Sequence, residues 1–176
     1  VGHDELSVEE NEDRFKISFK KNYPDLCKGR KIHIVDCTAF HDPHHDKSLR
    51  GHKGSHPKII QGLYSEPEIL KRINKPLAQM IASDPDDPKA SRHLIINVCK
   101  SGRHRSVANK ELQLQVVLRI LGYDQDSVEA IDLGDPTHWK HLCKPGCKHC
   151  EWDLVEYDDT GIPKFLVQGL DIICLL

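Results

Sequence analysis

The chain has 176 residues, with 25 Lys and Arg against 27 Asp and Glu, and a formal net charge of -2. A charge this close to zero creates no global field that would favour nucleic acid or a membrane surface. The length suits one domain with a sizeable core, and the sequence contains neither an apolar run of transmembrane length nor a signal-peptide pattern. Because it begins at Val1 without Met, we expect a processed product or part of something longer.

The cysteine count indicates the redox environment. The chain has seven cysteines, an odd number, and three of them lie close together near the C-terminal end. This pattern favours a metal site in a reducing compartment over a disulfide framework. We therefore expect the protein in the cytoplasm or another reducing compartment.

The N-terminal part, residues 1–28, is predicted to be an acidic tail with an edge strand. It begins with several carboxylates and then alternates apolar and polar residues through Phe15, Ile17 and Phe19. Alternation with a period of two is typical of a strand, and the lysines within it suit a sheet edge.

A second predicted strand, Lys31–Cys37, leads into a polar loop that runs to Pro57. The loop contains five of the twelve histidines: His41, His44, His45, His52 and His56. Three interpretations stay open: a divalent-metal site, a solvated loop, or a loop that supplies side chains to a ligand held elsewhere. We favour the third, because loops at the carboxyl ends of neighbouring strands meet in open α/β sheets.

The next predicted elements are a helix and a surface loop. Apolar residues at near-helical spacing predict a helix over Pro67–Ala82 that Pro76 kinks or splits. Ser83–Lys89 has three aspartates and two prolines, which favours a surface turn over an acid-base cluster.

The most informative stretch runs from His93 to Leu121. His93–Val98 predicts a core strand, and apolar residues four apart from Ala108 to Ile120 predict an amphipathic helix. Between them lies the anion loop, which consists of Cys99, Lys100, Ser101, Gly102, Arg103, His104, Arg105 and Ser106. Three cations and the unpaired N–H groups of a helix start predict a phosphate cradle. The alternatives are a structural turn, a purely structural His104 and a merely buried Cys99.

Ser127–Leu133 predicts a third strand after the helix stop at Gly122. Strands and helices then alternate along the chain. This order predicts a three-layer α/β fold with a largely parallel sheet and flanking helices.

The Cys/His-rich C-terminal segment predicts a structural zinc site. Cys143, Cys147 and Cys150 surround a Pro-Gly turn, with His141, His138 or His149 as the fourth ligand; we favour His141. Free thiols are the alternative. The C-x3-C-x2-C spacing also resembles the cluster motif of radical S-adenosylmethionine enzymes, but the long barrel domain of those enzymes is absent. The apolar Phe165–Leu176 must pack on the core or on another subunit, which suggests a homo-oligomer or larger assembly.

The anion loop resembles the C-x5-R loop of cysteine-dependent phosphatases through Cys99, Arg105 and Ser106. In that chemistry, the resemblance implies that Cys99 attacks phosphorus, that Arg105 clamps phosphate oxygens and that an Asp protonates the leaving group. Two features oppose this reading. Val98 replaces the usual His, and no Asp lies between Lys47 and Ser83, where the general acid is expected.

A second resemblance covers more of the chain, from about Lys31 to Gly134. The loop is similar to that of the C-terminal domain of RapZ, the bacterial RNase adapter family, in which a strand runs into C-x-G-G-K-H-R-S-V. The matching positions are Cys99, Gly102, His104, Arg105, Ser106 and Val107, with Arg103 for Lys. An upstream motif resembling D-x-R-x-L-P-N-P-H, then L-R and a Gly, is matched by Asp36, Pro43, His44, Leu49, Arg50 and Gly54.

The RapZ resemblance implies a sugar-phosphate-binding fold that senses glucosamine-6-phosphate and self-associates to present RNA to a nuclease. Carried over, Arg105, His104 and the Gly102 loop would hold the phosphate, with Asp36, His44 and Arg50 from the upstream motif. The departures are Lys100 and Ser101 for a Thr-Gly pair, Thr38 where Arg is expected, and no basic RNA-linked tail or P-loop. We therefore expect this chain to share the family's phosphate binding, whereas the resemblance gives little support for RNA as a partner.

The sequence thus predicts three parts: the tail and edge strand of residues 1–28, a RapZ-like α/β phosphate-binding domain over 29–135, and a zinc segment with an apolar tail over 136–176. The predicted function is that of a regulatory sensor or assembly module that binds a phosphorylated small molecule. The alternatives are a cysteine-dependent phosphatase that uses Cys99 as nucleophile, and a structural subunit of a larger assembly.

Overall fold

The computed structural model describes residues 8–81, 92–100, 102–120, 122–133, 143–144 and 146–174. These form the helices α1 (Val8–Asn22), α2 (Pro24–Cys27), α3 (Pro57–Gly62), α4 (Pro67–Ile73), α5 (Lys75–Ile81), α6 (Arg105–Gln115) and α7 (Lys164–Cys174), and the strands β1 (Lys31–Asp36) and β2 (His93–Val98). Short 3-10 turns lie at Cys37–Ala39, Pro43–His45, Leu63–Ser65 and Gln125–Ser127, and a π-helical turn at Val116–Ile120 extends α6. No described helix is long and apolar enough to cross a membrane.

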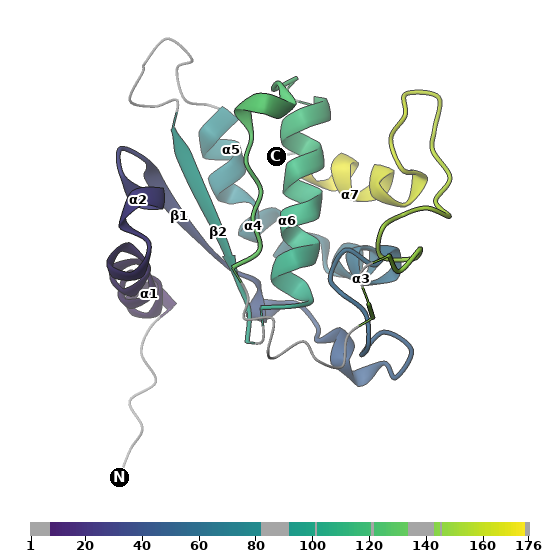
Figure 1. Ribbon diagram of the computed structural model, residues 1–176, viewed down its shortest axis with the longest axis horizontal. Helices are drawn as coiled ribbons and strands as arrows, with labels where there is room; N and C mark the ends of the chain where they lie inside the picture. Colours follow the sequence, from purple (N-terminus) through teal and green to yellow (C-terminus); the bar gives the residue numbers. More distant parts are fainter. Residues whose placement is uncertain are drawn as a thin grey trace.

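The two strands lie parallel in a two-stranded sheet, with Lys31 opposite His93 and Asp36 opposite Val98. Both strands therefore end at the same edge. The N-terminus of α6 lies beside that edge, at the lower end of the molecule in Figure 1. This arrangement brings the upstream loop and the anion loop together.

Helices cover both faces of the sheet, which confirms the three-layer α/β prediction (Figure 1). On one face, Phe19 of α1 packs with Ile32 and Ile96 of the strands. On the other, Val35 shares a large buried cluster with residues of α3, α4, α6 and α7. The apolar C-terminal stretch belongs to this second cluster through Leu166, Leu170 and Ile173. It therefore packs on the core, which was one of the two expected alternatives.

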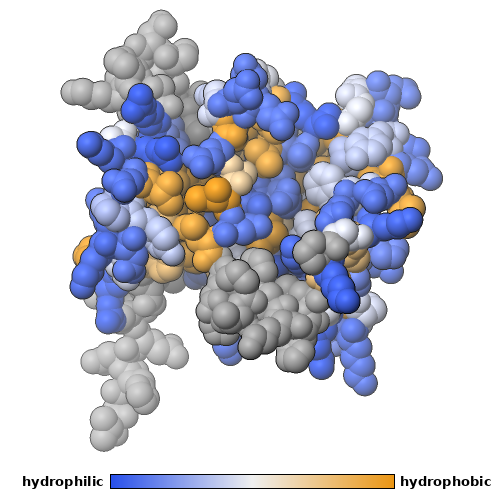
Figure 2. Space-filling view, in the orientation of Figure 1, coloured by the Kyte–Doolittle hydropathy of each residue, from blue (hydrophilic) through white to orange (hydrophobic). Residues whose placement is uncertain are grey.

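Two strand predictions were wrong. The residues expected to form an edge strand, around Phe15, lie within α1, where Phe15 and Phe19 stack four residues apart with ring centroids 6.1 Å apart. The expected third strand forms no ladder; it is a 3-10 turn followed by an extended segment, 128–133. In Figure 2, apolar side chains gather in the middle of the visible face, over β2 and this segment, where Ile131 is 44% exposed.

Other boundaries follow the expected local chemistry. The helix predicted over 67–82 is split into α4 and α5, with Asn74 between them and Pro76 in the first turn of α5. Gly122 follows the π-helical turn with a φ of 69°, a conformation that favours glycine after a helix.

A closed ring of four side-chain amides joins the junction of α4 and α5 to β2 and α6. Asn74 Nδ2 donates to Asn109 Oδ1 (3.2 Å), and Asn109 Nδ2 donates to Asn97 Oδ1 (2.7 Å). Asn97 Nδ2 donates to Gln113 Oε1 (2.7 Å), and Gln113 Nε2 returns to Asn74 Oδ1 (2.7 Å). Asn74 and Asn109 are fully buried, so the ring satisfies polar groups that would otherwise be costly to remove from water.

Candidate functional site

The anion loop leaves β2 and turns sharply into α6. Gly102 has a φ of 62° and its N–H donates to the Cys99 carbonyl, 3.3 Å away, so a tight turn reverses the chain here. The N-cap residue of α6, His104, makes no side-chain capping hydrogen bond. The first N–H groups of this eleven-residue helix carry partial positive charge.

Arg105 joins the anion loop to the loop that follows β1. Its Nη1 donates to the carbonyls of Thr38 (2.8 Å) and Phe40 (2.9 Å), and its Nη2 lies 3.4 Å from Asp42 Oδ2. The side chain is 9% exposed. The guanidinium expected to clamp a phosphate is thus bound to protein oxygens, and these contacts position the two loops.

The Asp42 carboxylate is stabilised in its charged form. Burial raises its pKa, but the His44 N–H and the nearby Arg105 outweigh burial, so the net pKa lies below the usual value. Asp36, which was expected near the ligand, instead accepts the Thr38 N–H at 2.8 Å and caps the turn after β1.

His104 has a protein partner as well. Its Nε2 lies 2.9 Å from the His52 carbonyl, which must accept, so Nε2 carries the proton. The residue is 2% exposed, and burial, with the Arg103 charge as a second cause, lowers its pKa to about 4. His104 is neutral at physiological pH and holds the neighbouring loop, as the structural alternative for this residue predicted.

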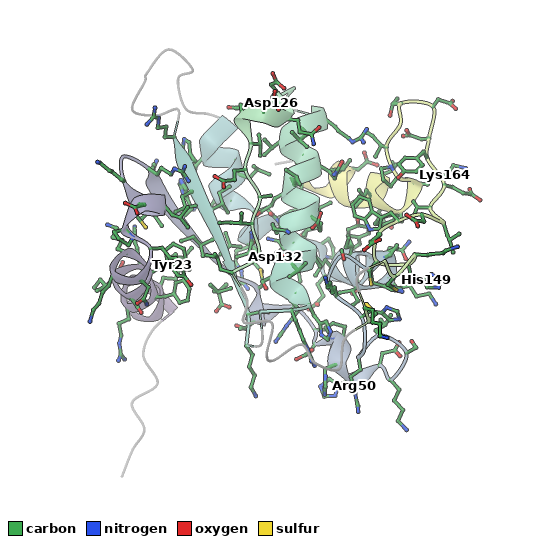
Figure 3. All side chains as sticks on the ribbon, in the orientation of Figure 1. Tyr23, Arg50, Asp126, Asp132, His149 and Lys164 are labelled. Carbon is green, nitrogen blue, oxygen red and sulfur yellow. The ribbon has the colours of Figure 1, made fainter. Side chains whose placement is uncertain are left out.

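The remaining cations of the two loops are less buried than Arg105. Lys100 is exposed, and Arg103 Nη2 lies 2.9 Å from His44 Nδ1. Arg103 Nε is buried and has no hydrogen-bond partner among the described residues. Arg50 Nε donates to the His44 carbonyl at 3.2 Å, and Figure 3 shows Arg50 at the lower end of the molecule.

The cysteine of the anion loop contacts the helix start. Cys99 Sγ lies 3.2 Å from Ser106 Oγ, and Ser106 is buried. Ser101 lies outside the described residues. The structure therefore brings together Arg103, His44, Arg50 and the start of α6, and it gives His104, Arg105 and Asp36 roles in holding the loops.

A second site forms where the Cys/His-rich segment meets the upstream loop. The metal group consists of His52, Cys143, Cys147 and Cys150, whose ligand atoms all lie within 4.8 Å of one another. Cys143 Sγ and Cys150 Sγ are 3.5 Å apart, and His52 Nδ1 lies 3.4 Å from Cys150 Sγ and 3.8 Å from Cys147 Sγ. This group could hold a metal ion.

The fourth residue differs from the expected one. His141 and His138 lie outside the described residues, and His149, on the Cys-rich segment in Figure 3, is not in the group. Sequence reasoning placed the fourth ligand nearby in the chain, whereas His52 is 98 residues from Cys150. The only signal for His52 was its place in a histidine-dense loop, for which metal binding was one open interpretation.

The thiols of the metal group differ in ionisation. Burial raises the pKa of Cys150 to about 12, whereas the Cys150 backbone N–H and other donors lower the pKa of Cys147. Without a cation, Cys150 is a neutral thiol, and a bound metal ion would reverse that preference. The chemistry of this group is that of a cation site.

Cavities lie elsewhere. A cavity of about 480 Å³ between α3, α7 and the Cys-rich segment is lined by residues such as Lys58, Leu154 and Phe165, and none of the anion loop lines it.

The comparison with protein families now decides the relationship. A family model described as the RapZ C-terminal domain matches residues 16–127, more than half of the chain. The chain belongs to the RapZ C-terminal domain family. No curated protein and no solved structure matches it significantly. Membership indicates a regulatory or binding module, and the match includes both loops at the sheet edge and His52, while the three cysteines of the metal group lie beyond it.

Proposed function

We propose that this RapZ-family module binds the phosphate group of a small phosphorylated molecule, of the sugar-phosphate class, at the anion loop. The observation that carries the proposal is the start of α6, whose N-cap residue makes no side-chain capping bond, beside the charged side chains of Lys100 and Arg103. An anion supplies acceptors for the first N–H groups of the helix and opposite charge for the two cations.

The residues divide into two roles. Arg103, Lys100 and the first N–H groups of α6 contact the phosphate, because charge-assisted bonds from several directions suit its oxygens. His44 orients Arg103 through their 2.9 Å contact. Arg105 and His104 hold the two loops in place. Arg50 positions His44 through its carbonyl.

The test is calorimetric titration with glucosamine-6-phosphate, glucose-6-phosphate and inorganic phosphate at constant ionic strength. Glucosamine-6-phosphate is tested first because the resemblance to the RapZ family implies this ligand. Losing a charged hydrogen bond costs about 1.5–3 kcal/mol, so Arg103→Gln is expected to weaken binding about tenfold or more. Lys20→Gln, an equal charge change on α1, is the matched control. Equal losses in both variants, or no binding by wild type, would contradict the proposal.

One observation favours a second function, that of a cysteine-dependent phosphatase. The 3.2 Å contact between Cys99 and Ser106 would suit a thiolate nucleophile that is stabilised by a hydroxyl. Against it, Arg105 is bound to Thr38 and Phe40 rather than free to clamp phosphate. Hydrolysis of an aryl phosphate that disappears in Cys99→Ser would establish this activity; none is expected.

We propose further that the metal is Zn²⁺, bound by the metal group in a structural role within a reducing compartment. Thiolates and imidazole are the ligands that zinc prefers, and Zn–S bonds of about 2.3 Å in a tetrahedron place ligand atoms roughly 3.8 Å apart. The separations of 3.4, 3.5 and 3.8 Å are close to this value.

Elemental analysis of the reduced protein is expected to find one zinc per chain. The zinc should be lost in Cys147→Ser and in His52→Ala, and kept in Cys27→Ser, whose thiol lies outside the metal group. His141→Ala distinguishes the two candidates for the fourth ligand. Zinc that survives His52→Ala but not His141→Ala would contradict the His52 assignment.

A further inference from the structure

The loop of residues 51–56 contacts the Cys-rich segment on one side and the anion loop on the other, and it contributes His52 to the metal group. On one side, the C-terminal segment binds it at three points. The Cys143 N–H donates to the Gly51 carbonyl (2.6 Å), the His52 ring meets the thiols, and Trp152 Nε1 donates to the Ser55 carbonyl (2.6 Å).

On its other side, the same loop supports the anion loop. His104 Nε2 donates to the His52 carbonyl, and the Gly54 N–H donates to the Arg103 carbonyl at 2.8 Å. A Cβ on Gly54 would lie 2.7 Å from the Ala108 amide nitrogen, so the backbones are in direct contact. His52 therefore serves both sites, the metal group through its ring and the anion loop through its carbonyl.

We propose that Zn²⁺ bound by the metal group raises the affinity of the anion loop for a phosphate group, so that ligand binding by this module responds to zinc. The inference rests on the proposed function. Metal binding supplies the free energy that orders the segments carrying its ligands. The ordered 51–56 loop then holds the backbone of Arg103 and the ring of His104, so the ligand meets a site that is already organised.

The coupling must be reciprocal. If zinc tightens phosphate binding by some factor, the phosphate ligand tightens zinc binding by the same factor. Couplings of this kind are about 5–150-fold, and we expect a change of about tenfold here. The reciprocity separates a true linkage from a nonspecific effect of zinc on the preparation.

The experiment uses the full chain, loaded with Zn²⁺ or stripped by a chelator. Glucosamine-6-phosphate and inorganic phosphate are titrated into both forms, and zinc affinity is measured by chelator competition with and without glucosamine-6-phosphate. Both measurements are expected to change by the same factor of about ten. In His104→Asn, which shortens the donor to the His52 carbonyl, that factor should fall toward one while zinc still binds.

A second measurement uses only the wild-type protein, so its result does not depend on whether a variant folds. Zinc is expected to slow amide hydrogen exchange in the anion loop by about tenfold, with little change in β1. Equal phosphate affinities with and without zinc would overturn the inference, as would unchanged exchange in the anion loop. So would global loss of helix on stripping, because zinc would then be required for folding as a whole.

The two proposals fail in distinguishable ways. If neither phosphate probe binds in either form, the proposed function fails and zinc-responsive ligand binding fails with it. A zinc-dependent slowing of anion-loop exchange would then still establish the link between the two sites. If the probes bind but ignore zinc, the function stands and the inference fails.

Discussion

Gly54 is the residue at which two loops from distant parts of the chain touch through their backbones. Any Cβ here would meet the Ala108 amide nitrogen, the Val107 side chain and, closest of all, the His104 carbonyl oxygen. Because two of these neighbours are backbone atoms at the start of α6, they cannot move aside cheaply.

Gly54→Ala is therefore expected to destabilise the protein by about 1–3 kcal/mol or more, as overpacked sites do. Urea unfolding measures the change. Gly62→Ala is the matched control, since a Cβ there has open space and the residue closes helix α3. That variant should be neutral or more stable by up to about 1 kcal/mol. Equal stabilities of the two variants would contradict the packing described.

The contacts of Arg105 give a second prediction. Its guanidinium spans two carbonyls and the Asp42 carboxylate at once, and an ammonium group cannot reproduce that fork. Arg105→Lys should cost roughly 2–3 kcal/mol of unfolding free energy. Arg50→Lys, at an exposed position, should change it by less than about 0.5 kcal/mol. A stable Arg105→Lys variant that no longer binds phosphate would instead place Arg105 in the ligand site.

Residue types and local order were enough to predict a cation-rich loop that turns from β2 into a helix. Gly102, the cations and the helix start are neighbours in sequence, and the structure keeps them together. The sequence did not predict which of these side chains have partners within the protein. The partners of Arg105 and His104 are 52–67 residues away, and only the folded chain brings them within hydrogen-bond distance.

A short sequence window also explains the wrong prediction for α1. Over seven residues, Phe15, Ile17 and Phe19 fit a strand. The helix follows a longer pattern in which Phe15, Phe19 and Tyr23 recur every four residues, and the ring of Phe19 contacts both neighbouring rings. Ile17, which the strand prediction placed with the apolar face, is 70% exposed. A window of nine residues, from Phe15 to Tyr23, is needed to separate the two periods.

The 128–133 segment shows the opposite limit. It has strand-like alternation, but Lys110 of α6 holds Asp132 at 2.9 Å, and Val128 packs on the main core. Figure 3 shows Asp132 beside α6. These contacts fix the segment in an extended form without pairing it to β2, and no feature of its own sequence could reveal them.

Tyr64 and α7 provide a prediction at this scale. Gly169 allows α7 to approach so closely that any Cβ there would overlap the Tyr64 ring. The Tyr64 hydroxyl is buried without a partner among the described residues, and burial raises its pKa. An unpaired buried hydroxyl costs about 1–3 kcal/mol, so Tyr64→Phe should raise the unfolding free energy by about 1 kcal/mol.

Thermal and urea unfolding test this prediction. Tyr123→Phe removes a hydroxyl from a residue that is 46% exposed and should leave stability unchanged. A Tyr64→Phe variant less stable than wild type would show that the hydroxyl has a partner.

For the whole molecule, the buried histidines predict acid sensitivity. Burial, with further contributions from neighbouring charges, lowers the pKa values of His33, His56 and His104 to about 4. The unfolded chain takes up these protons near pH 6.5, whereas the folded chain takes them up only near pH 4. Between pH 6.5 and pH 4 the unfolded state binds more protons, so the free energy of unfolding falls as pH falls. Above pH 6.5 the contribution of these histidines no longer changes with pH.

His33→Gln isolates one of these groups away from the metal group. The loss of melting temperature between pH 6.5 and 4 should be smaller in this variant than in wild type in the same metal state. Exposed His45→Gln should match wild type. Asp42 also loses stabilisation in acid, because its pKa is lowered, but only as pH falls through the range below its unfolded value near 4. A His33→Gln curve parallel to wild type would contradict the assignment.

The ring of four amides has a consequence for folding specificity. Each of the four side-chain NH₂ groups donates to the oxygen of the next amide in the cycle. The cycle can close only when the end of α4, β2 and α6 have one fixed position relative to one another. Sliding α6 by a single residue, about 1.5 Å along its axis, would open all of these bonds together. Each buried amide left unpaired costs about 1–3 kcal/mol, so neighbouring registers are excluded by a wide energy gap. Since α6 begins at the anion loop, the ring also fixes the distance at which the helix start stands from the end of β2.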